Sequence, residues 1–151
     1  MPIRIETGDF LLALDSHVPE LENYLDLRSG QVIPVTDYVP DDPAYAEFEE
    51  NREDESLYRL IDPVPSRQGW LWMEEFAEDV ADPRAREALL RSIERSGAFG
   101  RFKRTLHAYP GLRDAWFRFQ EERLLEYARE WLAVEGIDAE LTELPARARD
   151  T

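Results

Sequence analysis

The sequence predicts an α+β fold: a small β-hairpin or three-stranded antiparallel part near the N-terminus, packed on a C-terminal bundle of about four helices. Two observations carry this prediction. Short apolar runs between residues 24 and 61 are separated by turn residues, whereas the pattern from residue 66 onward repeats with the helical period of about 3.6 residues. The 151 residues, of which 43% are hydrophobic and 34% charged, suit a single globular domain over 1–151.

The N-terminal part, residues 1–65, holds the predicted strands. The turn at Ser29-Gly30 joins strands over 24–28 and 31–35 into a hairpin, because glycine tolerates positive φ. Pro34 cannot donate to a ladder, so the second strand should lie at a sheet edge or stop there. Residues 57–61 read as a third strand.

Two helices are also expected in this part. Thr7 is the predicted N-cap of a helix over 8–15, and Asp42-Pro43 is a typical helix start with proline at the first helical position. The seam between the two parts lies at 63–65, where two prolines flank a valine.

Residues 66–137 should form the helical part. The first helix is expected to be capped by Ser66, and the second to open at Asp82-Pro83. A third, short helix over 99–108 precedes a long helix over 112–135, which Gly136 should terminate. Residues 138–151 show no strong period, and we expect this tail to fray.

The formal net charge of −15 is spread unevenly. Residues 1–65 hold 16 acidic and 4 basic residues, a net charge of −12, whereas residues 66–151 hold 17 and 14, a net charge of −3. Acidity of this kind favours solubility and disfavours non-specific binding to nucleic acid or anionic membrane; mimicry of nucleic acid by an acidic face is the alternative. No apolar run approaches the roughly 20 residues of a membrane span, and no signal peptide is evident, so we expect a cytoplasmic protein.

A basic helix is the first candidate binding site. After Gly97, the apolar residues of 99–109 share one stripe, and the other side carries four groups that can be cationic: Arg101, Lys103, Arg104 and His107. Arg91 and Arg95 on the preceding helix are expected nearby. Guanidinium groups next to a helix N-terminus can hold an anion. The alternative is a solvated basic face that balances the acidic residues of the chain.

The long helix is the second candidate. Its apolar arc, centred on Trp116, covers well over half of its circumference, so it is either the central core helix or one that also shows an apolar strip to a partner. Arg113 and Arg123 lie within or beside this arc, and each needs a partner if buried. Glu74, Glu75 or Asp26 could supply that partner through an internal ion pair.

Catalytic and metal-binding patterns are weak. The chain has no cysteine, and its two histidines, His17 and His107, lie in no recognised ligand spacing. Glu74 and Glu78 offer two carboxylates one helical turn apart, a pattern more typical of a wet helix face. The sequence therefore indicates no cofactor and no metal, and favours a protein that is not an enzyme.

Short motifs along most of the chain, over residues 7–137, give it a resemblance to a known family. They are Tyr24-Leu25-Asp26-Leu27, Gly30-Gln31-Val32, Met73-Glu74-Glu75-Phe76, Gly97-Ala98-Phe99, Phe102-Lys103, Tyr109-Pro110, Trp116-Phe117, Glu122-Arg123, Trp131-Leu132 and Gly136-Ile137. In these motifs the chain resembles the bacterial group known as uncharacterised protein family 0158. The resemblance implies a small soluble bacterial protein and assigns no reaction, cofactor or partner.

Two functions are compatible with these features. The first is a non-enzymatic protein-interaction or regulatory module that docks another protein through its basic helix. The second is a binder of an anionic small ligand or nucleic acid, or an undetected enzyme, that uses the basic patch around 97–104. For the first function, the expected contact lies on Arg101, Lys103, Arg104 and His107, with exposed rings near Trp116. The second function would use the same patch together with Arg113 and Arg123.

Overall fold

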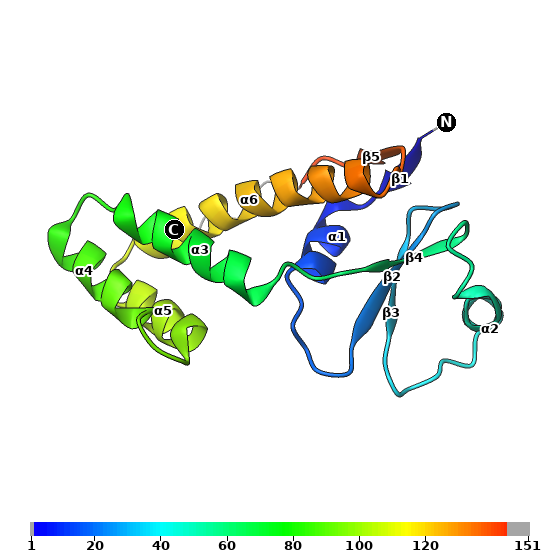
Figure 1. Ribbon diagram of the computed structural model, residues 1–151, viewed down its shortest axis with the longest axis horizontal. Helices are drawn as coiled ribbons and strands as arrows, with labels where there is room; N and C mark the ends of the chain where they lie inside the picture. The colour runs from blue at the N-terminus through cyan, green and yellow to red at the C-terminus, as the bar shows by residue number, and fades with distance from the viewer. Residues whose placement is uncertain (1, 145–151) are drawn as a thin grey trace. The chain divides into compact units, whose positions relative to one another are not determined.

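The computed structural model describes residues 2–144 and shows the predicted α+β fold (Figure 1). The described residues form six helices and five strands. They are organised in two compact units: unit 1 combines residues 1–63 with 127–151, and unit 2 spans 64–126. Unit 1 is therefore discontinuous in sequence, and each unit is described by itself below.

Unit 1 is built around a three-stranded antiparallel sheet. Strands β2 (Glu22–Asp26), β3 (Val32–Val35) and β4 (Tyr58–Ile61) lie in the order β3-β2-β4, which confirms both the predicted hairpin and its third strand. Pro34 lies on β3, an edge strand, as its missing N–H requires.

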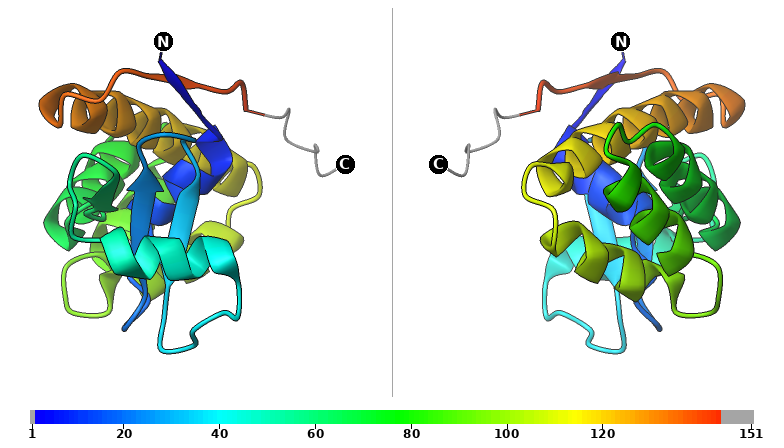
Figure 2. Two further views of the ribbon diagram at one scale, coloured as in Figure 1. Left: turned by 90° about the vertical axis from the view of Figure 1, so that its right-hand side faces the viewer. Right: turned by 90° about the vertical axis from the view of Figure 1, so that its left-hand side faces the viewer.

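Helix α2 (Pro43–Asn51) covers one face of this sheet (Figure 2). Asp42 is its N-cap, as predicted, and its Oδ1 accepts a hydrogen bond from the N–H of Ala44 at 3.0 Å. Phe48, which is 1% exposed, packs edge-on against Tyr58 with ring centroids 5.0 Å apart. These rings join Tyr45 and Val35 in one buried cluster, which anchors the helix to the sheet.

A second, two-stranded sheet was missed by the sequence analysis. Strand β1 (Ile3–Ile5) pairs in parallel with β5 (Ala139–Leu141), so the expectation that the chain frays from residue 138 is wrong for 139–141. Three residues are too few to show a period of two, and their partner lies at the far end of the chain. The rest of the predicted tail, 145–151, lies outside the described residues.

Helix α1 (Thr7–Leu14) follows β1 directly, and its expected cap is also corrected. Glu6 is the N-cap: its carboxylate accepts from the N–H groups of Gly8 at 3.2 Å and Asp9 at 2.9 Å. Thr7 is instead fully buried; its N–H donates to Oγ1 of Thr142 at 3.0 Å, and its hydroxyl donates to the carbonyl of Thr142. The threonine thus ties the start of α1 to the segment after β5.

Gly30 is where the hairpin touches the backbone of β1. Its φ is +81°, and a Cβ placed there would lie 2.1 Å from the carbonyl oxygen of Arg4. That separation is far inside any van der Waals contact, so only glycine allows both the turn and the close approach of β1.

Unit 2 consists of helices α3 (Ser66–Glu78), α4 (Pro83–Ser92), α5 (Ala98–His107) and the first half of α6 (Leu112–Val134). Asp82 caps α4 as predicted, accepting from the N–H of Arg84 at 3.0 Å. Ser66 does not cap α3; it is the first helical residue, Pro65 holds the cap position, and no side chain bonds there. Four helices thus make up the helical part, as expected.

Aromatic rings from three helices form the core of unit 2. Trp116 on α6 lies 4.9 Å from Phe102 on α5 and 5.4 Å from Phe76 on α3, measured between ring centroids and edge-on in both cases. Trp116 is 5% exposed and Phe102 1% exposed. These contacts fix α5 and α6 against α3, and they place the apolar arc of the long helix in the interior.

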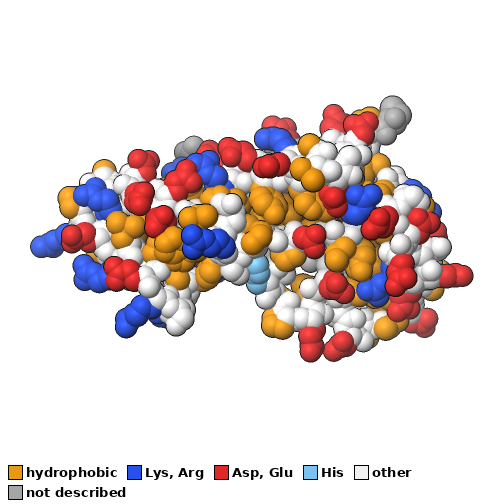
Figure 3. Space-filling model, viewed as in Figure 1, with side chains coloured by type: hydrophobic (Ala, Val, Ile, Leu, Met, Phe, Trp, Pro, Cys, Tyr) orange, Lys and Arg blue, Asp and Glu red, His pale blue; other side chains and the backbone are white. Residues whose placement is uncertain are grey.

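The two units differ completely in charge. Unit 2 holds 11 acidic and 11 basic residues and is formally neutral, whereas unit 1 holds 22 acidic and 7 basic residues and carries the whole net charge of −15. Lys and Arg side chains gather over the α4 end of the face in Figure 3, and Asp and Glu side chains gather over α2 and the strands beside it. Among the described residues, no helix is both long and apolar enough to cross a bilayer.

Candidate functional site

Four arginines line a hollow between α4 and α5 in unit 2. Arg91 and Arg95 come from the end of α4 and the loop after it, and Arg101 and Arg104 come from α5. The hollow has a volume of about 490 Å³, is open to solvent, and is completed by Ala88, Ser92 and Thr105. The structure therefore brings together the two segments that the sequence analysis expected to be neighbours.

Arg101 joins α5 to the end of α4 and to the loop between the two helices. Its Nε donates to the carbonyl of Ser92 at 2.9 Å, its Nη1 to that of Ser96 at 2.6 Å, and its Nη2 to that of Arg95 at 2.6 Å. These carbonyls belong to the last residue of α4 and to the loop before α5, where helix geometry leaves acceptors without partners. Arg101 is thus a clamp on the loop, and it is not the free cation that the sequence predicted.

The other three arginines project their charge into solvent. Arg95 and Arg104 are exposed, and the described residues offer neither of them a carboxylate within ion-pair distance. Arg91 lies 4.0 Å from Glu87, but both side chains are more than 70% exposed, so the pair contributes little. The hollow therefore carries an excess of positive charge on a neutral unit.

The remaining predicted site residues do not join this hollow. Lys103 and His107 are exposed and lie one turn apart on another side of α5. Arg113 is exposed on α6, with its guanidinium 5.5 Å from the ring centroid of Phe117. Trp116 is a core residue, which agrees with the first of the two alternatives for the long helix, so its ring is not available to a partner as a binding residue.

Arg123 is neutralised inside unit 2, which confirms one of the internal ion pairs considered from the sequence. Its Nη2 donates to Oε1 of Glu75 at 2.5 Å, and its Nη1 lies 3.6 Å from Oε1 of Glu126. The hydrogen bond to Glu75 raises the pKa of Arg123, and the guanidinium also stacks 4.5 Å from the ring centroid of Phe119. Arg123 is therefore a structural residue that joins α3 to α6.

Comparison with known proteins places the chain in a family. The Uncharacterised protein family (UPF0158) matches residues 1–146. The chain belongs to this family. It is also 34% identical over 144 residues to the UPF0158 protein PA5073 of Pseudomonas aeruginosa, an alignment that covers 95% of this chain and 91% of its relative. No solved structure matches the chain.

Membership in UPF0158 confirms the resemblance, and it assigns no activity to the arginine hollow. The chemistry must therefore come from the residues themselves. Guanidinium groups are planar, permanently charged donors that suit carboxylate and phosphate groups. Within residues 2–144, no three His, Asp or Glu side chains are grouped so that they could hold a metal ion. What the α4–α5 hollow of this UPF0158 protein offers is recognition of negative charge.

Sequence reasoning did not separate the arginines whose charge faces solvent from Arg101, whose guanidinium bonds to the loop before α5. Arg91 and Arg95 lie four residues apart in the sequence, and Arg101 and Arg104 lie three apart, so both pairs have helical spacing, although Arg95 lies in the loop after α4. That spacing was the available signal. Nothing in it shows that Arg101 is held by backbone carbonyls, because those acceptors become available only once α4 ends at Ser92.

Proposed function

We propose that this protein is a non-enzymatic interaction module that binds an acidic segment of another protein through the α4–α5 hollow. The observation that carries the proposal is the convergence of Arg91, Arg95 and Arg104 on one open surface, with weak or no internal neutralisation. We also place its site of action in the cytoplasm, which the absence of cysteine is compatible with.

Three features support a protein segment over other anions. The hollow is open, whereas a small ligand is typically held in an enclosed pocket that buries most of its surface. Nucleic-acid binding depends on the neutralisation of many phosphates, and the hollow offers only three outward-facing arginines for it. The rigid clamp of Arg101 sets the loop that carries Arg95, so part of the surface is organised before a partner arrives.

The test is a binding titration with defined probes. A fluorescent oligoglutamate peptide should bind the wild type at low salt, and the affinity should fall as salt screens the contact. The triple variant Arg91→Gln/Arg95→Gln/Arg104→Gln should lose this binding by at least about tenfold, which corresponds to about 1.4 kcal/mol.

A matched control separates the position of the charge from its amount. Arg67, Arg84 and Arg113 are exposed on the same unit and lie outside the hollow, and their replacement by glutamine removes the same three charges. The affinity of the control triple for the peptide should stay within about twofold of the wild-type affinity, whereas the hollow triple should lose about tenfold, or about 1.4 kcal/mol. Equal losses in the two triples would overturn the proposed site, and a tighter complex with a single-stranded oligonucleotide than with the peptide would overturn the proposed partner.

A further inference from the structure

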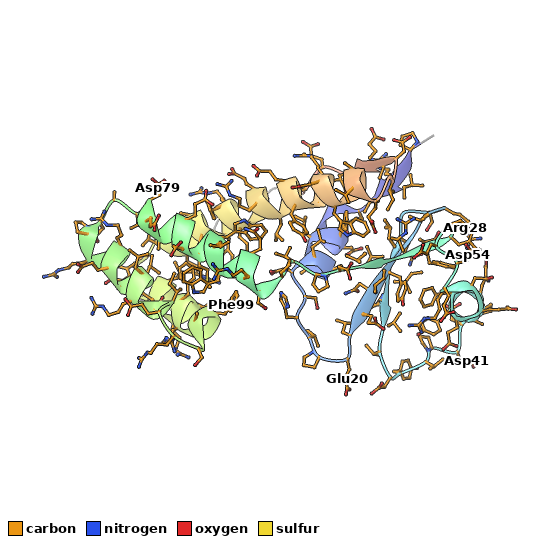
Figure 4. The ribbon with its side chains drawn as sticks, in the orientation of Figure 1. Glu20, Arg28, Asp41, Asp54, Asp79 and Phe99 are labelled. Atoms are coloured by element: carbon orange, nitrogen blue, oxygen red, sulfur yellow. The ribbon has the colours of Figure 1, made fainter. Side chains whose placement is uncertain are left out.

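A second hollow in unit 2 has the opposite character. It lies between the C-terminal end of α3 and the first half of α6, with a volume of about 850 Å³. Its lining combines apolar side chains, among them Phe76, Phe119 and Leu112, with the carboxylates of Glu78, Asp79 and Glu122. Asp79 is the C-cap of α3, as Figure 4 shows, so the negative end of the helix dipole adds to these charges.

The negative charge of this α3–α6 hollow is only partly balanced. Arg123 is occupied by Glu75 and Glu126, and Arg118 is the other cation of the lining. Glu78, Asp79 and Glu122 are exposed and have no ion pair with any residue between 2 and 144. An occupant that suits this hollow combines an apolar group, which packs on the apolar side chains of the lining, with a cation, which pairs with its carboxylates.

Helix α5 presents that combination on a ridge formed by Phe99, Lys103 and His107. The three residues are spaced by four, so they follow one another along one side of the helix. Phe99 is 44% exposed, although it touches Gly69 of α3, and Lys103 is exposed without an ion pair in the described part of the chain. This ridge is distinct from the arginine hollow, which Arg101, Arg104 and Thr105 border on another side of α5.

We infer that the occupant of the α3–α6 hollow is the α5 ridge of a second copy of this chain. The two surfaces match in charge and in apolar character. Both surfaces lie on unit 2, which has no formal net charge, so the two units that meet do not repel each other through net charge.

A single contact of this kind joins two different surfaces, so each copy retains one free ridge or one free hollow and association can continue beyond two copies. Two reciprocal contacts about a twofold axis would instead close a dimer. This inference does not depend on the proposed function, because it uses neither Arg91, Arg95 nor Arg104.

Complementation between two variants tests the inference. Lys103→Glu breaks the ridge and leaves the hollow intact, whereas Glu122→Lys breaks the hollow and leaves the ridge intact. In sedimentation velocity, the wild type should show a sedimentation coefficient that rises with protein concentration, and each variant alone should remain monomeric. A one-to-one mixture should associate again, because the intact hollow of the Lys103→Glu variant can receive the intact ridge of the Glu122→Lys variant, and the two reversed charges attract each other as well.

Three results would overturn the inference. The wild type could stay monomeric at every concentration, or a single variant could associate as the wild type does. The mixture could also stay monomeric while the wild type associates. Circular dichroism verifies that each variant is folded, and Lys103→Gln with Glu122→Gln provide a milder pair in which association should weaken without charge reversal. The triple variant of the arginine hollow should associate like the wild type, so failure of this inference and failure of the proposed function are distinguishable.

Discussion

Replacing Gly30 by alanine should destabilise unit 1 by about 3 kcal/mol or more. The new Cβ would lie 2.1 Å from the carbonyl oxygen of Arg4, so the hairpin and β1 must separate by about 1.3 Å or more to reach an ordinary contact of 3.4 Å. Positive φ alone costs a non-glycine residue about 1 kcal/mol. Moving β1 also exposes Ile5, which is fully buried, at a cost of roughly 2 kcal/mol.

Gly136→Ala provides the control for this prediction. Gly136 has a similar φ of +69°, but a Cβ at this position would meet no other atom within 4 Å, so only the conformational cost of about 1 kcal/mol applies. The free energy of unfolding of both variants can be measured by urea denaturation. Equal losses for the two would refute the reasoning, because they would show that the close approach to Arg4 does not constrain position 30.

Three further predictions concern other parts of the fold. Arg101→Lys should cost about 1–2 kcal/mol of stability and weaken oligoglutamate binding, because one ammonium cannot reach three diverging carbonyls; unchanged denaturation and binding curves would contradict the clamp. Trp116→Ala should cost about 3–5 kcal/mol, measured by urea denaturation, since it removes the ring shared by Phe76 and Phe102. Hydrogen bonds from Ser56 lower the pKa of Asp54 in the folded protein. The wild type should therefore be more stable than Asp54→Asn above the ordinary aspartate pKa of about 4, and this difference in the free energy of unfolding should vanish as the pH falls through the lowered pKa. A difference that grows in acid would contradict this sign.

Local signals predicted the elements whose causes are local. Asp42 and Asp82, each followed by proline, begin helices where the sequence indicated, and Ser29-Gly30 makes the hairpin turn. Thr7 and Ser66 look like equally good caps, but Glu6 takes the first cap position with its longer side chain and Thr7 is needed to hold Thr142. Thr7 therefore fails as a cap because a distant partner takes its side chain, whereas Ser66 is the first helical residue and no side chain caps α3.

The positive charge of α5 is visible in sequence, but the partners of each charged group are not. Arg104 lines the hollow, whereas Arg101 and Arg123 are held by the protein itself. For Arg123, Glu75 lies 48 positions away but was a considered partner, since a buried arginine needs a hydrogen-bond acceptor and a carboxylate is one that the sequence reveals. For Arg101, the acceptors are backbone carbonyls, which every residue carries and no composition reveals.

The pairing of β1 with β5 has a consequence for synthesis of the chain on the ribosome. Residues 64–126 are contiguous, so unit 2 can close soon after it is made. Strand β1, in contrast, must wait for Ala139–Leu141, which are made more than 130 residues later, before it has a partner. During that interval its edge stays unpaired and open to chaperones and to mispairing.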